Sequence, residues 1–130
     1  MIAVDTSALL AIVLNEKQAD ACVGALESQD RVLISAGTLA EALLVAARRN
    51  VEAEIDRMVE ALGFEVVNVT AATARRVALA YRRWGRWCGT AGLNFGDCFA
   101  YVIAHEHGCP LLYFGRDFAK TDVESVLNDR

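Results

Sequence analysis

The sequence predicts an α/β fold, a three-layer α/β/α sandwich with a mainly parallel central sheet. Short apolar segments typical of strands alternate with longer segments of helical apolar spacing along the whole chain. The 130 residues contain 55% hydrophobic residues and one proline, a composition that excludes a disordered chain. No repeat, linker or change of composition divides the sequence. We therefore expect one domain over residues 1–130, with one hydrophobic core.

The first half of the chain predicts two strands and four helices. Residues 1–4 form a short apolar run that ends at an acid, which is typical of a buried strand, and residues 31–35 predict a second strand. Apolar residues at helical spacing predict the four helices, the last of which ends at Gly63. The helices are expected at residues 7–14, 16–26, 38–49 and 51–62.

The second half predicts two strands, two helices and a short final element. The β-branched residues in 65–69 predict a strand, and Thr70 can cap the helix that follows. The apolar stripe of that helix is expected to consist of Ala74, Val77, Tyr81 and Trp84. A glycine-broken loop, a helix and a strand are expected at residues 85–92, 95–107 and 110–114.

Membrane and disulfide-rich classes are excluded by the sequence pattern. The longest apolar run covers seven residues, 8–14, whereas a membrane-spanning helix needs about 20. The four cysteines have neither a paired metal-site spacing nor a disulfide framework. We expect a cytoplasmic protein with reduced cysteines and no membrane partner.

Four acidic residues fall where a parallel sheet places its ligands, outside the carboxyl ends of the strands. Asp5 ends the first strand, Glu41 follows the second, Asp97 begins a helix after the glycine loop, and Asp117 follows the last strand. Clustered carboxylates repel one another unless a cation joins them, and oxygen ligands suit Mg²⁺ or Mn²⁺. Two such ions can hold a phosphodiester and activate water.

Helix capping is the alternative interpretation of the same residues. Residues 38–41 and 94–97 both have the pattern of a capping box. Asp5 can cap the helix near Ser7, and Asp117 can cap a final turn. Capping does not require all four acids to meet at one edge, so their joint placement favours a functional site.

Several of these segments together resemble PIN-domain proteins, and more narrowly the VapC toxins of bacterial toxin–antitoxin pairs. The resemblance covers essentially the whole chain. Besides the helix that contains Glu41, the segments are 1–8 (MIAVDTSA), 93–101 (LNFGDCFAY), 115–118 (GRDF) and 121–122 (TD).

The resemblance implies a PIN-like fold and a Mg²⁺- or Mn²⁺-dependent endoribonuclease. It further implies an RNA substrate, inhibition by a VapB-type antitoxin, and a homodimer. The acidic residues that match those of the family are Asp5, Glu41, Asp97 and Asp117. Ser7 and Asn94 match polar positions that support the metal or the substrate phosphate. The sequence departs from similar toxins at Arg116, where Asn or Asp is common, and in the loop 87–90.

An uneven distribution of charge marks a possible binding face. The net charge is −4, yet residues 66–96 contain five arginines and no acid. The five are Arg75, Arg76, Arg82, Arg83 and Arg86. Together with Trp84 and Trp87, this arginine face suits single-stranded RNA. Docking of the antitoxin and a purely solvated face are the open alternatives. Arg116, which is next to Asp117 in the sequence, is a further candidate to bind an RNA phosphate.

Two other function classes compete with the ribonuclease. One is a non-catalytic PIN-like module that binds RNA or protein, against which the intact carboxylates count. The other is a phosphatase-type α/β hydrolase, which requires Asp-x-Asp after the first strand. Ser7 stands at the position of the second Asp, so this class is disfavoured.

Overall fold

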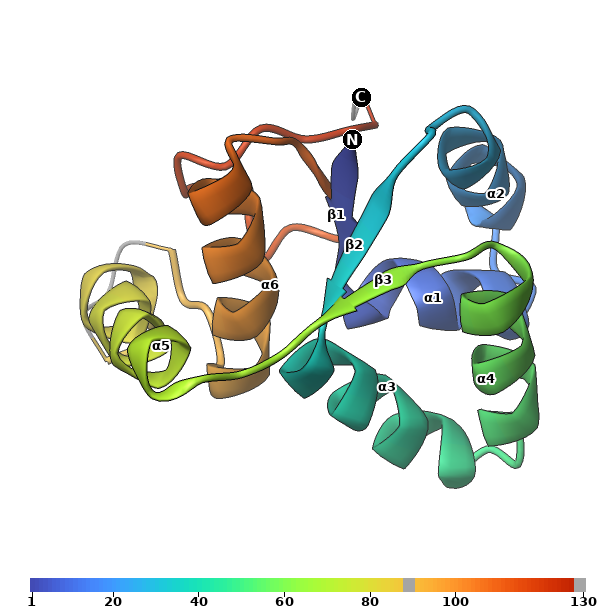
Figure 1. Cartoon of the computed structure of the whole chain (residues 1–130), viewed down its shortest axis with the longest axis horizontal. Helices are drawn as coiled ribbons and strands as arrows, with labels where there is room; N and C mark the ends of the chain where they lie inside the picture. The colour runs from blue at the N-terminus through green and yellow to red at the C-terminus, as the bar shows by residue number, and fades with distance from the viewer. Residues whose placement is uncertain (88–90, 128–130) are drawn as a thin grey trace.

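The computed structural model describes residues 1–87 and 91–127, and it contains the predicted parallel sheet (Figure 1). The strand order is β3-β2-β1-β4, and all three pairings between neighbours are parallel. The carboxyl ends of all four strands therefore point to the same edge. The strands are β1 (Ile2–Val4), β2 (Val32–Ser35), β3 (Glu65–Val67) and β4 (Leu111–Leu112).

Helices cover both faces of the sheet, which confirms the predicted three-layer sandwich (Figure 1). Ala3 and Leu33 pack with the α5–α6 side, whereas their neighbours Val4 and Ile34 pack with the side of α1 to α4. This alternation follows from the two-residue period of a strand. The helices are α1 (Thr6–Val13), α2 (Ala19–Glu27), α3 (Ala36–Ala47), α4 (Glu52–Ala61), α5 (Ala71–Trp84) and α6 (Phe95–His107).

Helix α3 begins two residues earlier than predicted. Its N-cap is Ser35, the last residue of β2, whose hydroxyl accepts a hydrogen bond from the Gly37 N–H at 3.1 Å. Thr38 is therefore buried inside the helix and is not a cap. The predicted capping box over 38–41 is wrong because strand β2 passes directly into the helix.

The buried stripe of α5 includes Val77, with Tyr81 and Trp84 half-buried against the core, but it differs from the predicted stripe at Ala74. Thr70 caps the helix as expected, but Thr73, Val77 and Ala80 are the buried residues. Ala74 is exposed, so its inclusion in the stripe was wrong. Contact with α6 decides which face of α5 is buried, and that contact cannot be derived from spacing within α5 alone.

Three cysteines, Cys22, Cys98 and Cys109, are buried and free, as expected for reduced thiols. Cys88 and the rest of the segment 88–90 lie outside the described residues. Within the described ranges, no helix is both long enough and apolar enough to cross a bilayer.

Helices α3 and α6 approach closely at Gly37. A methyl group at this position would lie 2.5–2.9 Å from three ring atoms of Phe99. Gly37→Ala is therefore expected to lower the free energy of unfolding by about 1–3 kcal/mol, the usual cost of overpacking. Urea denaturation measures this change.

Gly24→Ala is the matched control, because Gly24 lies inside helix α2 with nothing within 4 Å of an added methyl group. It is expected to raise stability by about 0.5–1 kcal/mol. Equal effects of the two substitutions would contradict the close packing of α3 against α6.

Candidate active site

Asp5 lies at the carboxyl end of β1 and caps helix α1. Its Oδ2 accepts hydrogen bonds from the Ser7 N–H at 3.0 Å and from the Ser7 hydroxyl at 2.7 Å. The Ser7 Oγ in turn accepts the Phe114 N–H at 2.9 Å, so it joins α1 to the segment after β4. The second carboxylate oxygen, Asp5 Oδ1, is buried without a hydrogen-bond partner in the described structure. The capping interpretation is thus confirmed for one oxygen and leaves the other unexplained.

Asp97 is held at the start of α6 by a capping box. The Asn94 Oδ1 accepts the Asp97 N–H at 2.9 Å, and the Asp97 Oδ2 accepts the Asn94 N–H at 3.0 Å. The sequence pattern predicted this box. Asp97 is buried, with 6% relative exposure for the residue.

Glu41 reaches the same edge from within α3. Its Oε1 accepts a hydrogen bond from the Thr6 hydroxyl at 3.0 Å. The carboxylate also lies against Gly96, where an added methyl group would be 2.6 Å from Glu41 Cδ. Sequence reasoning missed both Thr6 and Gly96. The threonine directly follows Asp5, and the glycine directly precedes Asp97. These positions indicate a role in the site only when the structure shows that α3 lies beside them.

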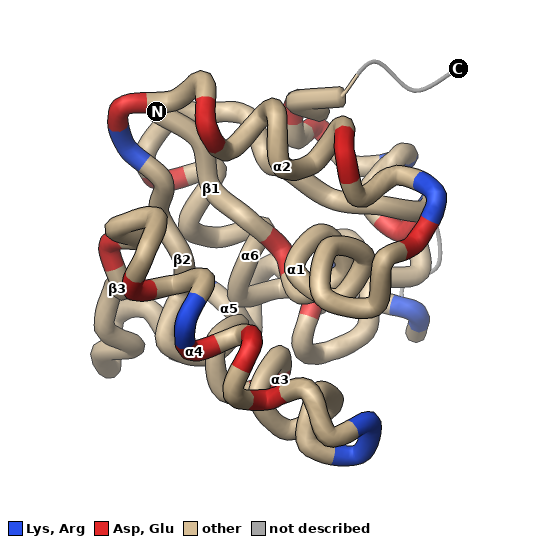
Figure 2. Tube along the Cα trace, turned by 90° about the vertical axis from the view of Figure 1, so that its right-hand side faces the viewer, with Lys and Arg blue, Asp and Glu red and all other residues tan. Residues whose placement is uncertain are grey.

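The charges of the four acids act on one another. Burial raises the pKa of Asp5 to about 6, and the charge of Glu41 adds to the increase. Burial likewise raises the pKa of Asp97 to about 7, with contributions from Asp5, Asp117 and Glu41. Asp117 is the exposed member of the cluster. Asp97 is thus within electrostatic reach of the other three acids that the sequence selected. In Figure 2 an acidic segment is visible where β1 meets α1.

The donor set of this acidic site suits a hard cation. It consists of carboxylates, with one amide and one hydroxyl beside them, and the buried Asp5 Oδ1 is an acceptor that still lacks a partner. Such oxygen-rich sets favour Mg²⁺ or Mn²⁺. Within residues 1–87 and 91–127 no three acidic, histidine or cysteine side chains already have the spacing of a finished metal site. To hold a cation, these side chains would have to move closer together.

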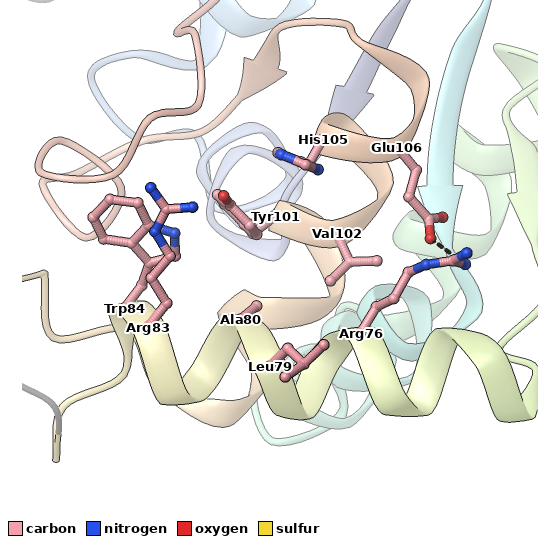
Figure 3. Close-up of a pocket in the computed structure, with 9 residues that line it drawn as sticks. All are labelled: Arg76, Leu79, Ala80, Arg83, Trp84, Tyr101, Val102, His105 and Glu106. Atoms are coloured by element: carbon pink, nitrogen blue, oxygen red, sulfur yellow. Dashed lines mark ion pairs between the residues drawn. The ribbon is translucent and has the colours of Figure 1, made fainter.

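The arginine face divides into two parts. Arg76 forms an ion pair with Glu106 at 2.6 Å, and Arg83 lies 3.9 Å from Asp122. Both line a groove between α5 and α6 (Figure 3). Arg75, Arg82 and Arg86 are exposed, and the ion pairs found among the described residues do not include them.

The carboxyl-terminal end of the arginine face lies near the acids. The backbone of Arg86 bonds to Leu93, directly before the capping box of α6. Arg76, by contrast, pairs with Glu106 near the far end of that helix. Arg116 is exposed and adjoins Asp117 in the segment after β4.

Comparison with known proteins assigns the fold to a family. A family model described as "PIN domain" matches residues 2–124. The chain belongs to the PIN domain family. Among curated PIN relatives, Ribonuclease VapC of Mycolicibacterium smegmatis is 38% identical over 95% of this chain and 98% of its own length. Ribonuclease VapC28 of Mycobacterium tuberculosis is also 38% identical, over 98% of both chains. The chain is thus a PIN protein of the VapC group, and the phosphatase-type alternative no longer applies.

Solved structures agree with this PIN fold. VapC20 of Mycobacterium tuberculosis, described as a sarcin-ricin loop cleaving toxin, superimposes with a TM-score of 0.78 at 18% identity. The alignment covers 95% of this chain and 96% of VapC20. A toxin–antitoxin complex from Klebsiella pneumoniae gives a TM-score of 0.71 at 22% identity, over 99% of this chain and 100% of that one. At such identities these matches bear on the fold alone.

Proposed function

We propose that this PIN protein is a VapC-type toxin, a Mg²⁺- or Mn²⁺-dependent endoribonuclease that hydrolyses RNA phosphodiester bonds. The observation that carries the proposal is the buried acidic site in a chain that matches proteins named ribonuclease VapC over nearly its whole length. The proposal includes a cytoplasmic location and a homodimer.

Asp5, Asp97 and Asp117 would hold the cation, with Glu41 beside them. When bound, Mg²⁺ or Mn²⁺ supplies a Lewis acid for the phosphate and lowers the pKa of a water molecule. Ser7 fixes one oxygen of Asp5 with two hydrogen bonds, which leaves Oδ1 for the cation. Asn94 holds the Asp97 carboxylate at the start of α6, and the hydrogen bond from its N–H opposes the rise in the Asp97 pKa that burial causes.

Glu41 is the residue proposed to accept a proton from the attacking water. Thr6 holds its Oε1 at 3.0 Å, so Oε2 is the atom proposed to take the proton. This arrangement orients Oε1 and leaves Oε2 free to accept the proton. A general base must lie within hydrogen-bond reach of the proton that it accepts, so the position of this carboxylate is critical.

Gly96→Ala tests the role of Glu41 without changing an acid. The added methyl group would overlap the Glu41 carboxylate and force the flexible side chain away from Thr6. We expect RNA cleavage to fall roughly ten- to a hundred-fold, the usual effect of a lost supporting contact. The value of kcat/KM measures this change, with Gly24→Ala as control. Parent-like kcat/KM in a folded Gly96→Ala protein would contradict the proposed position of Glu41.

The RNA backbone is proposed to meet arginines near the acidic site. Arg82, Arg86 and Arg116 are assigned to phosphate contacts, because Arg76 and Arg83 are paired within the chain. Phosphate contacts of this kind position the RNA and add affinity without reading its sequence.

The proposed partner is a VapB-type antitoxin. Its support is that similar folds occur in a toxin–antitoxin complex from Klebsiella pneumoniae and in VapBC2 from Rickettsia felis. Expression of the chain alone is expected to arrest bacterial growth and to create new RNA ends. Co-expression of the antitoxin encoded beside it is expected to prevent both effects. A folded protein that neither slows growth nor changes RNA ends would count against the proposed function.

A further inference from the structure

Two exposed phenylalanines adjoin residues of the acidic site. In the described part of the chain the exposed aromatic residues are Trp87, Phe95 and Phe114, with exposed fractions of 85%, 65% and 38%. Phe95 is the first residue of α6, directly after the cap Asn94. Phe114 follows β4, and its N–H donates to Ser7, the residue that holds Asp5. Two of these three aromatic side chains thus adjoin residues that hold the acids in place.

The ring of Phe95 is fixed on the Glu41 side of the site. It packs edge-to-face against Phe99, with ring centroids 5.1 Å apart and an interplanar angle of 81°. Phe99 lies against Gly37 of α3, and the Glu41 carboxylate lies against Gly96 at the same contact between α3 and α6. This neighbour holds the ring of Phe95 while 65% of the residue remains exposed.

The rings of the α5–α6 groove differ from Phe95 because they are covered within the chain. The Arg83 guanidinium lies 4.6 Å above the ring of Trp84. Tyr101 stacks on His105 with centroids 5.6 Å apart and an interplanar angle of 23° (Figure 3). The groove therefore offers no comparable open aromatic face for a nucleobase, although arginines surround it.

We infer that Phe95 and Phe114 are base-stacking residues, each taking an unpaired nucleobase of RNA beside the phosphate at the acids. The inference rests on the proposed function and adds to it the side chains that contact the bases, which must be free of a duplex in order to stack. Stacking of one base on an aromatic side chain changes affinity by about 5- to 150-fold.

The test measures RNA binding in the Asp97→Asn protein with Mg²⁺, so that the probe stays intact. The probe is a short single-stranded RNA of mixed sequence with a fluorescent label, read by anisotropy. Phe95→Ala and Phe95→Leu are each expected to raise Kd by about 5-fold or more. Phe95→Tyr is expected to keep the parent Kd, because it retains the ring. Phe114→Ala is expected to act in the same direction, and the double substitution to give the larger loss.

Two controls separate stacking from other roles. Leu79→Ala removes a side chain of similar exposure, 58%, from α5 and should leave Kd unchanged. An abasic ribose-phosphate chain of equal length should bind equally to the parent and to Phe95→Ala, since it has no base to stack. An unchanged melting temperature confirms that each variant is folded.

The possible results distinguish this inference from the proposed function. A parent protein that cleaves RNA while Phe95→Ala and Phe114→Ala keep its Kd overturns the stacking alone. An equal loss of affinity for the abasic chain also overturns the stacking. A changed oligomeric state with unchanged RNA binding overturns it as well, because the phenylalanines then contact protein. A parent protein that neither binds nor cleaves RNA overturns both proposals.

Discussion

Asp5→Asn is expected to reduce RNA cleavage by about a thousand-fold, which corresponds to roughly 4 kcal/mol of transition-state stabilisation. The substitution keeps the size of the side chain and an oxygen that can accept the hydrogen bonds from Ser7. It removes the negative charge and changes the buried Oδ1, the atom that has no partner within the chain. Loss of activity without loss of the fold therefore separates cation binding from helix capping.

The control for Asp5→Asn is the same chemical change at an exposed site. Asp56 lies in α4 and is exposed, so Asp56→Asn should retain parent activity. Cleavage is measured as kcat/KM on one RNA for all three proteins, purified in parallel to control for contaminating ribonuclease. If Asp5→Asn kept more than about a tenth of parent activity, Asp5 would have only the structural role of a cap.

The second large effect is on stability as a function of pH. Burial raises the pKa of Asp5 from 3.8 to about 6 in the folded protein, so the folded state binds this proton more tightly than the unfolded state. The resulting stability is fully present below about pH 4 and is lost as the pH rises through about 6. A shift of this size corresponds to about 3 kcal/mol of unfolding free energy.

Urea denaturation of metal-free protein between about pH 4 and pH 8 measures this loss. The parent is expected to lose about 3 kcal/mol more than Asp5→Asn over this range, because the variant has no carboxylate to ionise at this position. Mg²⁺ is expected to restore stability to the parent at neutral pH through binding to the folded state. If the unfolding free energies of the two proteins changed equally with pH, the pKa of Asp5 would not be raised in the folded state.

Local patterns were sufficient to predict much of the fold and part of the acidic site. The alternation of strand and helix segments predicted a parallel sheet with both faces covered. The parallel sheet in turn predicted that Asp5 and Asp97 would meet at one edge. The box formed by Asn94 and Asp97 was predictable because its hydrogen bonds join residues three apart.

Features that depend on contacts between distant segments could not be predicted in this way. The hydrogen bond from Thr6 to Glu41 joins residues 35 positions apart. The pairing of Arg76 with Glu106 depends on how α5 packs against α6. This ion pair gives Arg76 a structural contact within the chain, whereas the sequence indicated RNA binding. The start of α3 at Ala36 was missed because Ser35 is both the end of a strand and a helix cap.

The most direct test of the account is the dependence of RNA cleavage on a divalent cation at the acidic site. Parent and Asp97→Asn proteins, purified in parallel, are stripped with EDTA and assayed on the same RNA before and after addition of Mg²⁺ or Mn²⁺. We expect no cleavage by either stripped protein, and recovery on addition of the cation in the parent alone. Undiminished cleavage by the parent in excess EDTA, or equal recovery in Asp97→Asn, would contradict it.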